Sequence, residues 1–381
     1  MHEADRQRLL ADVEAFCQAL REHEELAYVE HHYNDKLIPL AKQHNILGMP
    51  VPVQYGGRGA DAVTYARALA RIGQEGTGVR TFFSGHTSIG QYPIMTWGNE
   101  DQKRRYLPAS CTGDKILAFG LTEPEAGSNP LEMQSTYERK SDHFALNGVK
   151  YLISNAGIAT TVVTFAYPKL GGRISAFIAD LSEPGCARED LVAKVGMPTA
   201  NTGMFELTDF KVPANNLLGT EGDGFRIAMG TLVSGRLSVA AGCLGVIEDC
   251  LIESLRYAKE RQQHGKPIGK HQLVQDHLTA IEMARIATEA LVMKAAQAKD
   301  AGSPEAELLA AKAKLYAANA AWEAADHAVQ VFGGRGWSTL YRPGRHLMDV
   351  RVCRIYEGTD EILKLKIAAA LLGGKEFEAY K

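Results

Sequence analysis

Several patterns that would classify this chain at once are missing from its sequence. The 381 residues include only six cysteines, and no two of them form a C-x-x-C pair. A framework of three disulfides would be sparse for this length, so we interpret the cysteines as reduced thiols of a cytoplasmic protein. The N-terminal segment MHEADRQRLL is charged and lacks the apolar stretch of a signal peptide. The cysteines are Cys17, Cys111, Cys186, Cys243, Cys250 and Cys353.

The charge and hydropathy patterns exclude two further classes. The formal net charge is -3 and the isoelectric point is near 6.5, which gives no basic surface for nucleic acid. No apolar run approaches the roughly 18 residues that a membrane span needs, so we expect no membrane segment. The motifs G-x-G-x-x-G, G-x-x-x-x-G-K-[ST] and H-E-x-x-H are absent. Because no Cys/His cluster has zinc spacing, we also expect no metal site.

The character of the sequence changes twice along its length. Hydrophobic residues make up 45% and charged residues 23%, as in soluble globular proteins, and the length suggests two or three structural units. Residues 1–118 carry apolar side chains at helical spacing, as from Leu9 to Leu20. Residues 119–225 show short β-branched and aromatic runs between turn residues, and residues 226–381 are rich in helix formers. We therefore predict an α+β chain of three domains, in the order helical, β and helical.

Three segments combine residue types that suit a cofactor, although each has a simpler explanation. Segment 119–129 supplies hydroxyls and backbone amides around a glycine, which suit a planar polar ring or a phosphate, or form an ordinary loop. Segment 257–268 places Arg261 near a helix end, where its guanidinium binds a pyrophosphate or is merely solvated. In segment 328–337 two glycines stop a helix, for a close backbone approach or as a plain C-cap.

A fourth segment, 354–362, contains a carboxylate in an unusual setting. Glu357 lies between an apolar stretch and a Gly-Thr turn. A carboxylate in a partly apolar site has a raised pKa and serves as a general base, whereas the simpler alternative is a buried helix-cap carboxylate. Glu361 follows at a position that also suits an ordinary first-turn helix charge.

Together, and in this order, the four segments resemble the acyl-CoA dehydrogenase family, in particular its short- and medium-chain members. The resemblance covers nearly the whole chain, and a chance match to all of its moderately specific motifs in register is remote. It implies an N-terminal helical domain, a middle β-barrel or sandwich domain and a C-terminal four-helix bundle. The further matching motifs are at residues 47–57, 146–150, 211–219, 222–225 and 356–359.

The resemblance implies FAD as the cofactor, with the isoalloxazine ring against the middle domain. The family's tryptophan and threonine at the flavin face fall on Leu152 and Ser154. Serine keeps the hydroxyl that would reach N5, while leucine replaces the aromatic wall and leaves that face more open. The family's loop at the isoalloxazine and its pyrimidine edge falls on Phe119, Leu121, Thr122, Gly127 and Ser128.

Other cofactor positions match residues that the family uses across a subunit interface. The resemblance therefore implies a homotetramer, built as a dimer of dimers, in which each FAD contacts two chains. Thr359 and Glu361 match positions near the adenosine half, whereas His264 replaces the family's phenylalanine at an adenine-side contact. The matching interface and cofactor positions are Arg261, Gln263, Gln272, Gln330, Gly333 and Gly334.

Glu357 matches the catalytic base of most family members. Other members place the base one residue before Arg236, where this chain has Gly235. The resemblance implies that Glu357 removes the α-proton of an acyl-CoA thioester while a hydride leaves the β-carbon for flavin N5. The backbone N–H of Glu357 and a ribityl hydroxyl of FAD would polarise the thioester carbonyl. Electrons would then pass to an electron-transfer flavoprotein.

The substrate positions suggest what the far end of the acyl group carries. Glutaryl-CoA dehydrogenases have an arginine at the position of Arg80 and a serine at that of Ser84, and both hold a distal carboxylate. This spacing places the two side chains on one face of a helix. We predict a short acyl group with a distal acidic or polar end; equally open is an Arg80 that pairs with a protein carboxylate or turns to solvent. The other residues that we place at the substrate are Ser128, Arg236, Tyr356 and Gly358.

Several departures from the family keep other functions open. Asn129 stands where the family has aspartate, and Ala369 where some members have an arginine near CoA, so the thioester rides either on CoA or on a carrier protein. A reductase or a desulfinase of the same fold is an alternative, as is an acyl-CoA oxidase that admits O₂ at the open Leu152 face. A non-catalytic flavin-binding protein belongs to a different class, and the presence of Glu357 argues against it.

Overall fold

The structure is a computed structural model that describes residues 1–377, and its N-terminal region is helical. Leu9, Val13 and Leu20 recur at helical spacing and are buried on one side of α1. Asp61 caps α3 by accepting a hydrogen bond from Thr64 N. The helices are α1 (Glu3–Glu30), α2 (Leu37–Gln43), α3 (Ala62–Glu75), α4 (Thr77–Phe83), α5 (Tyr92–Trp97) and α6 (Glu100–Cys111), with a π-helical segment, Ser84–Gln91, between α4 and α5.

The middle region forms an eight-stranded sheet with the order β6-β7-β3-β2-β4-β5-β8, and β1 pairs in parallel with β4. Tyr137, Phe144 and Phe177 meet edge to face in its core. The longest pairing joins β3 and β7, and its register shifts twice. The strands are β1 (Leu117–Gly120), β2 (Thr136–Arg139), β3 (His143–Ser154), β4 (Thr161–Pro168), β5 (Ser175–Asp180), β6 (Cys186–Asp190), β7 (Thr202–Pro213) and β8 (Leu217–Leu218).

The C-terminal region is a helical bundle whose long members are α7, α8 and α9. Helix α7 packs against α9, α8 and the N-terminal helix α3. A Cβ atom on Gly245 of α7 would lie 1.9 Å from the carbonyl oxygen of Ala70, so α3 approaches α7 at a point where only glycine fits. The elements are α7 (Gly224–Glu260), β9 (Gln262–Gln263), β10 (Lys266–Pro267), α8 (Gln272–Asp300), α9 (Ala306–Phe332), α10 (Arg342–Val350) and α11 (Asp360–Leu372).

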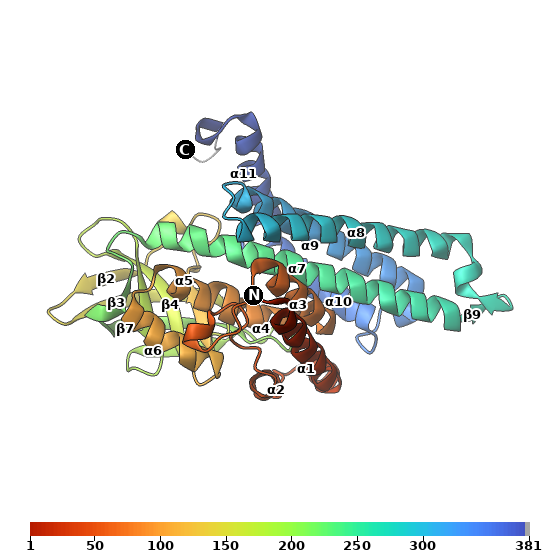
Figure 1. Cartoon of the computed structure of the whole chain (residues 1–381), viewed down its shortest axis with the longest axis horizontal. Coiled ribbons are helices and arrows are strands. Elements are labelled where there is room, and N and C mark those ends of the chain that lie inside the picture. The colour runs from red at the N-terminus through yellow and green to blue at the C-terminus, as the bar shows by residue number, and fades with distance from the viewer. Residues whose placement is uncertain (378–381) are drawn as a thin grey trace.

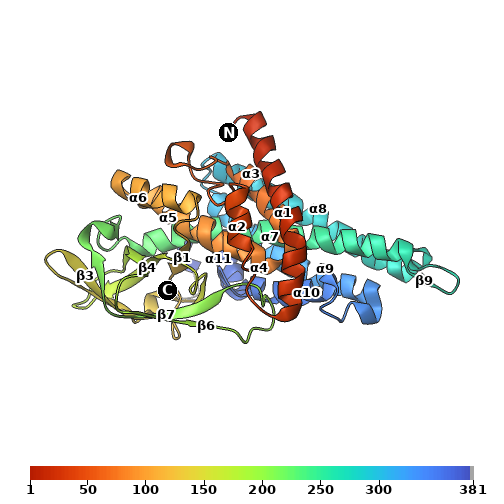
Figure 2. The same ribbon diagram turned by 90° about the horizontal axis from the view of Figure 1, so that it is seen from below.

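Helix α7 organises the molecule. It runs along most of the longest dimension, with the sheet beside its first half and the β9–β10 hairpin at its far end, while α11 projects away from the bundle (Figure 1). Seen after a quarter turn, α1 and α3 cross the middle of the molecule (Figure 2). The element changes at Leu117 and Gly224 fall two residues before the domain starts predicted at 119 and 226. The domain boundaries themselves stay a prediction.

Helix α7 also corrects one statement from the sequence, that no apolar segment approaches the length of a membrane span. It contains a window of 18 residues with a mean hydropathy of 1.5, which is long and apolar enough by composition alone. The window was missed because glycine, serine and one arginine interrupt its apolar residues. Of this window, 83% is buried inside the molecule, as for the core helix of a bundle, so the helix is weak evidence for a membrane segment.

The glycine contact between α3 and α7 predicts that Gly245→Ala lowers stability. Alanine in a helix interior ordinarily adds about 0.5–1 kcal/mol relative to glycine, but here the new Cβ meets backbone at 1.9 Å. We expect the free energy of unfolding, measured by chemical denaturation, to fall by about 1–3 kcal/mol, the usual cost of overpacking. Glu22→Ala is the control, because Glu22 is an exposed residue of α1 that makes no side-chain hydrogen bond or ion pair in the described residues. An unchanged Gly245→Ala midpoint would contradict the close packing of α3 on α7.

Candidate active site

A cavity of about 110 Å³ brings two groups of predicted residues together. One group, predicted to face the flavin, comes from the end of β1 and from β3. The other, predicted for acyl binding and proton transfer, comes from α4, the π-helical segment and the turn before α11. The residues that line the cavity are Arg80, Thr81, Ser84, Gly85, Ile89, Phe119, Leu121, Thr122, Leu152, Ile153, Ser154, Leu232, Val239, Tyr356 and Glu357.

The wall that is predicted to face the flavin depends on an irregularity in β3. The pairing of β3 with β7 shifts register between Lys150 and Ile153, and Leu152 there has a φ of 57°, in the left-handed region. Leu152 is consequently 50% exposed although it belongs to a strand of the core sheet. The Leu152 side chain and Ser154 thus line the cavity together. The N–H of Tyr151 donates to Thr122 O at 2.9 Å, which holds the loop after β1 against this wall.

A buried ion pair that the sequence analysis did not identify supports the same wall. Lys150 Nζ lies 2.7 Å from Glu123 Oε1, with both side chains almost fully buried, and Glu123 also accepts hydrogen bonds from Gln134 N and Ser135 N. Burial lowers the pKa of Lys150 to about 8, against the attraction of Glu123. The pair ties the loop that carries Thr122 to β3. In the sequence, this ion pair is indicated only by the presence of Glu123 next to Thr122 and of Lys150 two residues before Leu152.

Glu357 has the environment of a general base. Its φ is 57°, and the turn is held by Arg236 Nε, which donates to Glu357 O at 3.1 Å, and by Lys314 Nζ, which donates to Gly358 O at 2.7 Å. Its Oε2 atom is buried and has no hydrogen-bond partner in the described residues. Burial raises the pKa of Glu357 to about 7, while Arg236, then Arg80 and Lys314, act in the opposite direction.

The alternative base position lies directly beside this carboxylate. A Cβ on Gly235 of α7 would be 2.3 Å from Glu357 Oε2 and 2.5 Å from Glu357 Cδ. The space that a side chain at position 235 would need is therefore filled by the Glu357 carboxylate. The two positions reach the same point of the cavity, and this chain fills it from the turn before α11.

Arg80 lines the other end of the cavity, and neither simple alternative describes it. It is 2% exposed, so it does not turn to solvent. Within residues 1–377, no Asp or Glu oxygen lies within ion-pair distance of it; Arg80 Nη2 instead donates to the Tyr356 hydroxyl. Its stem passes Gly242 of α7, where a Cβ would lie 2.7 Å from Arg80 Cδ. Ser84, one turn further on, lines the same cavity.

Six other predicted cofactor residues lie at the far end of the bundle. Arg261 ends α7 beside the β9–β10 hairpin, about 39 Å along the helix from Gly235 at 1.5 Å per residue. Arg261 is exposed and makes no ion pair in the described part of the chain. A single cofactor at the cavity does not reach these residues within one chain. The predicted cofactor residues at this far end, all of which are exposed, are Arg261, Gln263, Gln272, Gln330, Gly333 and Gly334.

Two glycines fit a group that comes from outside the chain. A Cβ on Gly127 or Gly334 would meet no atom within 4 Å, and neither has a positive φ, so the fold itself does not require glycine there. Ser128, next to Gly127, is exposed and does not line the cavity. Thr359 caps α11 by accepting from Ile362 N. These positions are open to a bound cofactor but make no contact with the cavity.

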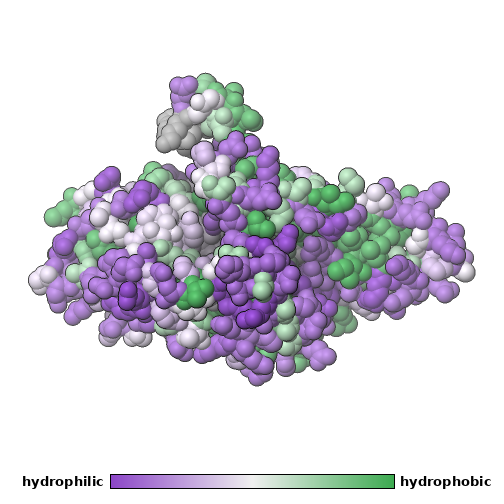
Figure 3. Space-filling model, viewed as in Figure 1, coloured by the Kyte–Doolittle hydropathy of each residue, from purple (hydrophilic) through white to green (hydrophobic). Residues whose placement is uncertain are grey.

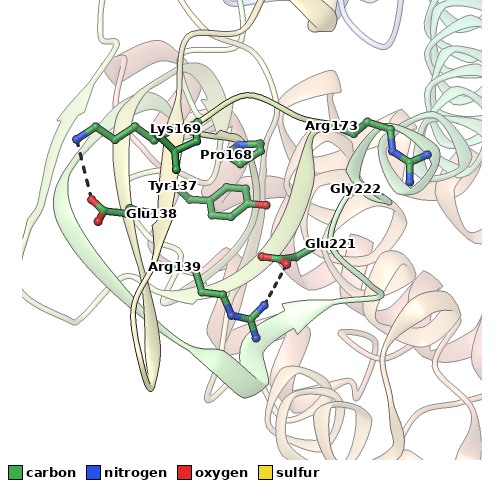
Figure 4. Close-up of a pocket in the computed structure, with 9 residues that line it drawn as sticks. Tyr137, Glu138, Arg139, Pro168, Lys169, Arg173, Glu221 and Gly222 are labelled. Carbon is green, nitrogen blue, oxygen red and sulfur yellow. Dashed lines mark hydrogen bonds and ion pairs between the residues drawn. The ribbon is translucent and has the colours of Figure 1, made fainter.

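A second cavity is larger but does not have the chemistry of the first. It measures about 520 Å³ and lies at the edge of the sheet. Both of its acidic side chains form ion pairs, Glu221 with Arg139 at 3.0 Å and Glu138 with Lys169 at 4.0 Å. The two pairs lie on either side of Tyr137 (Figure 4). No residue predicted for the flavin or the base lines it. In the described residues, no group of three His, Cys, Asp or Glu side chains is arranged to hold a metal ion.

Comparison with known proteins identifies relatives that have the same three-domain organisation. Family models described as the N-terminal, middle and C-terminal domains of acyl-CoA dehydrogenase match residues 3–114, 118–210 and 222–372. An acyl-CoA dehydrogenase of Bacillus subtilis is 41% identical over 345 residues, which cover 89% of this chain and 90% of that protein.

Two solved structures are similar over nearly their whole length. Butyryl-CoA dehydrogenase from Megasphaera elsdenii has a TM-score of 0.93 at 36% identity and covers 98% of this chain and 99% of its own. A glutaryl-coenzyme A dehydrogenase in complex with glutaryl-CoA has a TM-score of 0.93 at 33% identity, covering 99% and 97%. With matches to all three domains of the family and these relatives, the chain belongs to the acyl-CoA dehydrogenase family of FAD-dependent oxidoreductases, which act on CH–CH bonds.

Proposed function

We propose that the protein oxidises a short acyl-CoA thioester to its α,β-unsaturated form, with Glu357 as the base. The observation that carries this proposal is the buried Glu357 carboxylate, which has no hydrogen-bond partner at Oε2 and shares a cavity with the residues predicted to face the flavin. A carboxylate whose pKa lies near 7 is ionised in a useful fraction at neutral pH and still accepts a proton readily.

The residues of this chain divide the reaction between them. FAD, when bound, supplies the acceptor for the hydride that leaves the β-carbon. Thr122, Leu152 and Ser154 would hold its ring at the cavity. Glu357 Oε2 takes the α-proton. The Glu357 N–H donates to no group in the described residues and is free to polarise the thioester carbonyl.

Replacing the base tests the function directly. Glu357→Gln should fold, retain FAD and stay yellow, but lose flavin reduction by several orders of magnitude, because an amide does not accept the α-proton. The measurement is flavin bleaching after anaerobic addition of acyl-CoA, in a screen that includes branched and dicarboxylyl thioesters. Glu323→Gln, an exposed carboxylate of α9, is the control and should reduce normally. In the wild type, kcat/KM should rise with pH through about 7, as Glu357 ionises.

Gly235→Ala tests the same assignment without changing Glu357 itself. Its Cβ would displace the carboxylate, so flavin reduction should slow while FAD content stays unchanged. Near-normal reduction in both Glu357→Gln and Gly235→Ala would refute Glu357 as the base.

We propose an electron-transfer flavoprotein as the acceptor of the electrons, following the resemblance to the family. The exposed Leu152 side chain supports one second candidate, because an open flavin face admits O₂. Stoichiometric peroxide release during aerobic turnover would identify the protein as an acyl-CoA oxidase instead.

We propose that the protein assembles as a homotetramer, a dimer of dimers. The cofactor positions are divided between the cavity and the far end of α7, so that two chains complete each FAD site. Apolar side chains are exposed along the outer helices, and the space-filling view shows hydrophobic surface over this part of the bundle (Figure 3). The large exposed apolar residues in the second half of α7 and in α8 are Ile252, Leu255, Leu273, Met283 and Ile286.

The assembly proposal predicts a tetramer that shares its cofactor sites. Light scattering at micromolar concentration should give four times the 41.5 kDa of the chain. Arg261→Ala should lose FAD on dilution, because an unpaired guanidinium suits the pyrophosphate. Arg256→Ala, on the same helix end but already paired with Glu253 and Glu260, is the control. A monomer that holds FAD stoichiometrically would contradict the proposal.

We propose that the acyl group is short and carries a distal acidic or polar end. Gly235, which borders Glu357, and Gly242, which borders Arg80, are seven residues apart on α7. At 1.5 Å per residue, the points on α7 that border the base and the stem of the cation are therefore about 10 Å apart along the helix axis. A desolvated cation at that distance suits a carboxylate, because a buried charge without a counter-charge is costly.

Arg80→Met tests the substrate proposal. At mildly acidic pH, wild type should prefer glutaryl-CoA over butyryl- or hexanoyl-CoA in kcat/KM, and the variant should reverse the preference. A charge-assisted hydrogen bond is worth about 3 kcal/mol, so the ratio should change roughly a hundredfold. If wild type prefers the plain aliphatic thioester and Arg80→Met leaves that preference unchanged, the acidic-substrate proposal is wrong.

A further inference from the structure

A cluster of thiol and phenol groups lies behind Arg80. Cys353 Sγ is 3.1 Å from the Tyr356 hydroxyl and 4.0 Å from Arg80 Nη2. The Arg80 guanidinium lies 5.4 Å from the centre of the Tyr356 ring and donates to its hydroxyl. Cys353 and its neighbour Cys243 of α7 are each 1% exposed. Tyr356 lines the cavity, so this cluster forms the back of its Arg80 end.

The buried positive charge of Arg80 requires a counter-charge within the protein whenever no acidic ligand is bound. Burial opposes that charge, but attraction to Tyr356 and Cys353 raises the pKa of Arg80 above its ordinary value. A guanidinium stays protonated in proteins. Since no carboxylate lies within ion-pair distance among residues 1–377, the acidic groups within reach of Arg80 are a thiol and a phenol, and a thiol is ordinarily the stronger acid.

The surroundings of Cys353 favour its ionised form. The neighbouring Cys243 thiol lowers the pKa of Cys353 to about 6, assisted by Arg80, Tyr356 and Lys314 and opposed by burial. The pKa values of Cys243 and Tyr356 are instead raised, Cys243 by its interaction with Cys353 and Tyr356 by burial. The groups that face Cys353 thus come from α4 (Arg80), α7 (Cys243), α9 (Lys314), α10 (Asp349) and its own segment (Tyr356).

We propose that Cys353 is the internal counter-charge of Arg80, a positioning residue whose protonation sets which acyl groups the cavity accepts. The specificity part of this inference rests on the proposed function. As a thiolate, Cys353 neutralises Arg80, and the cavity suits an uncharged acyl chain. As a thiol, it leaves Arg80 free to pair with a carboxylate at the distal end of the substrate. Binding of an acid-tipped acyl group then takes up one proton at Cys353, because two anions beside one cation repel each other.

The ratio of two kcat/KM values, for glutaryl-CoA and for butyryl-CoA, isolates this effect from the titration of Glu357, which affects both substrates. In wild type the ratio should fall as pH rises above about 6, by up to about tenfold per pH unit. The reason is that Cys353 must take up one proton from solution for each acid-tipped substrate that binds. In Cys353→Ser, whose hydroxyl still bonds Tyr356 but does not ionise, the ratio should not depend on pH. Cys250→Ala, a buried thiol elsewhere on α7, should retain the wild-type slope. A slope that survives in Cys353→Ser, or a flat wild-type ratio, would overturn the specificity part.

A measurement without turnover separates this inference from the proposed function. A thiol has an S–H stretching band in the infrared, and a thiolate has none. The difference spectrum of wild type minus Cys353→Ser should show the band well below pH 6 and lose it well above, whereas Arg80→Met should keep the band at the higher pH. A band present in the wild-type difference at every pH would show that Cys353 is not the counter-charge. If no acyl-CoA reduces the flavin but the band is lost as expected, the proposed function fails and the counter-charge assignment stands.

Discussion

Close approach to α7, made possible by its glycines, is the constraint on which the candidate site depends. Gly235 leaves space for the Glu357 carboxylate, Gly242 for the Arg80 stem and Gly245 for the backbone of α3. Positions 235 and 242 are seven residues apart and therefore face the same side of the helix. A side chain at any of the three would push away the base, the cation or the N-terminal helices. Helix α7 thus determines where the predicted base and the cation stand.

Burial acts on the two ends of the cavity in opposite ways. For Glu357 it favours the neutral form, so that the pKa of the carboxyl approaches neutrality and the group exchanges protons easily. Arg80 stays charged in the same surroundings because its intrinsic pKa is far above neutral, and it draws polar groups toward itself instead. One cavity therefore holds a carboxyl group that titrates near neutral pH and a guanidinium that stays charged.

The sequence predicted the three-part fold and the cavity residues for different reasons. Helices such as α1 were readable from apolar spacing, and the family fold is confirmed by the three domain matches. The motif around Glu357 pointed to the base, whose role stays a prediction. The Lys150–Glu123 pair and the contact of Cys353 with Arg80 join residues far apart in the chain, and no local pattern records such pairings. The bend that exposes Leu152 arises from a register shift between β3 and β7, which also depends on distant pairing.

Helix α7 is a single α-helix of 37 residues, which passes the cavity at Leu232 and Val239 and ends next to Arg261. Such a rod has a fixed pitch as well as a fixed length. Adding or deleting one residue between Gly235 and Arg261 would rotate one end against the other by about 100° and shift it by about 1.5 Å. The number of residues between those two positions is therefore itself a structural parameter of the protein. Loops on the surface tolerate insertions, but this stretch of chain admits changes of residue type and not of residue number.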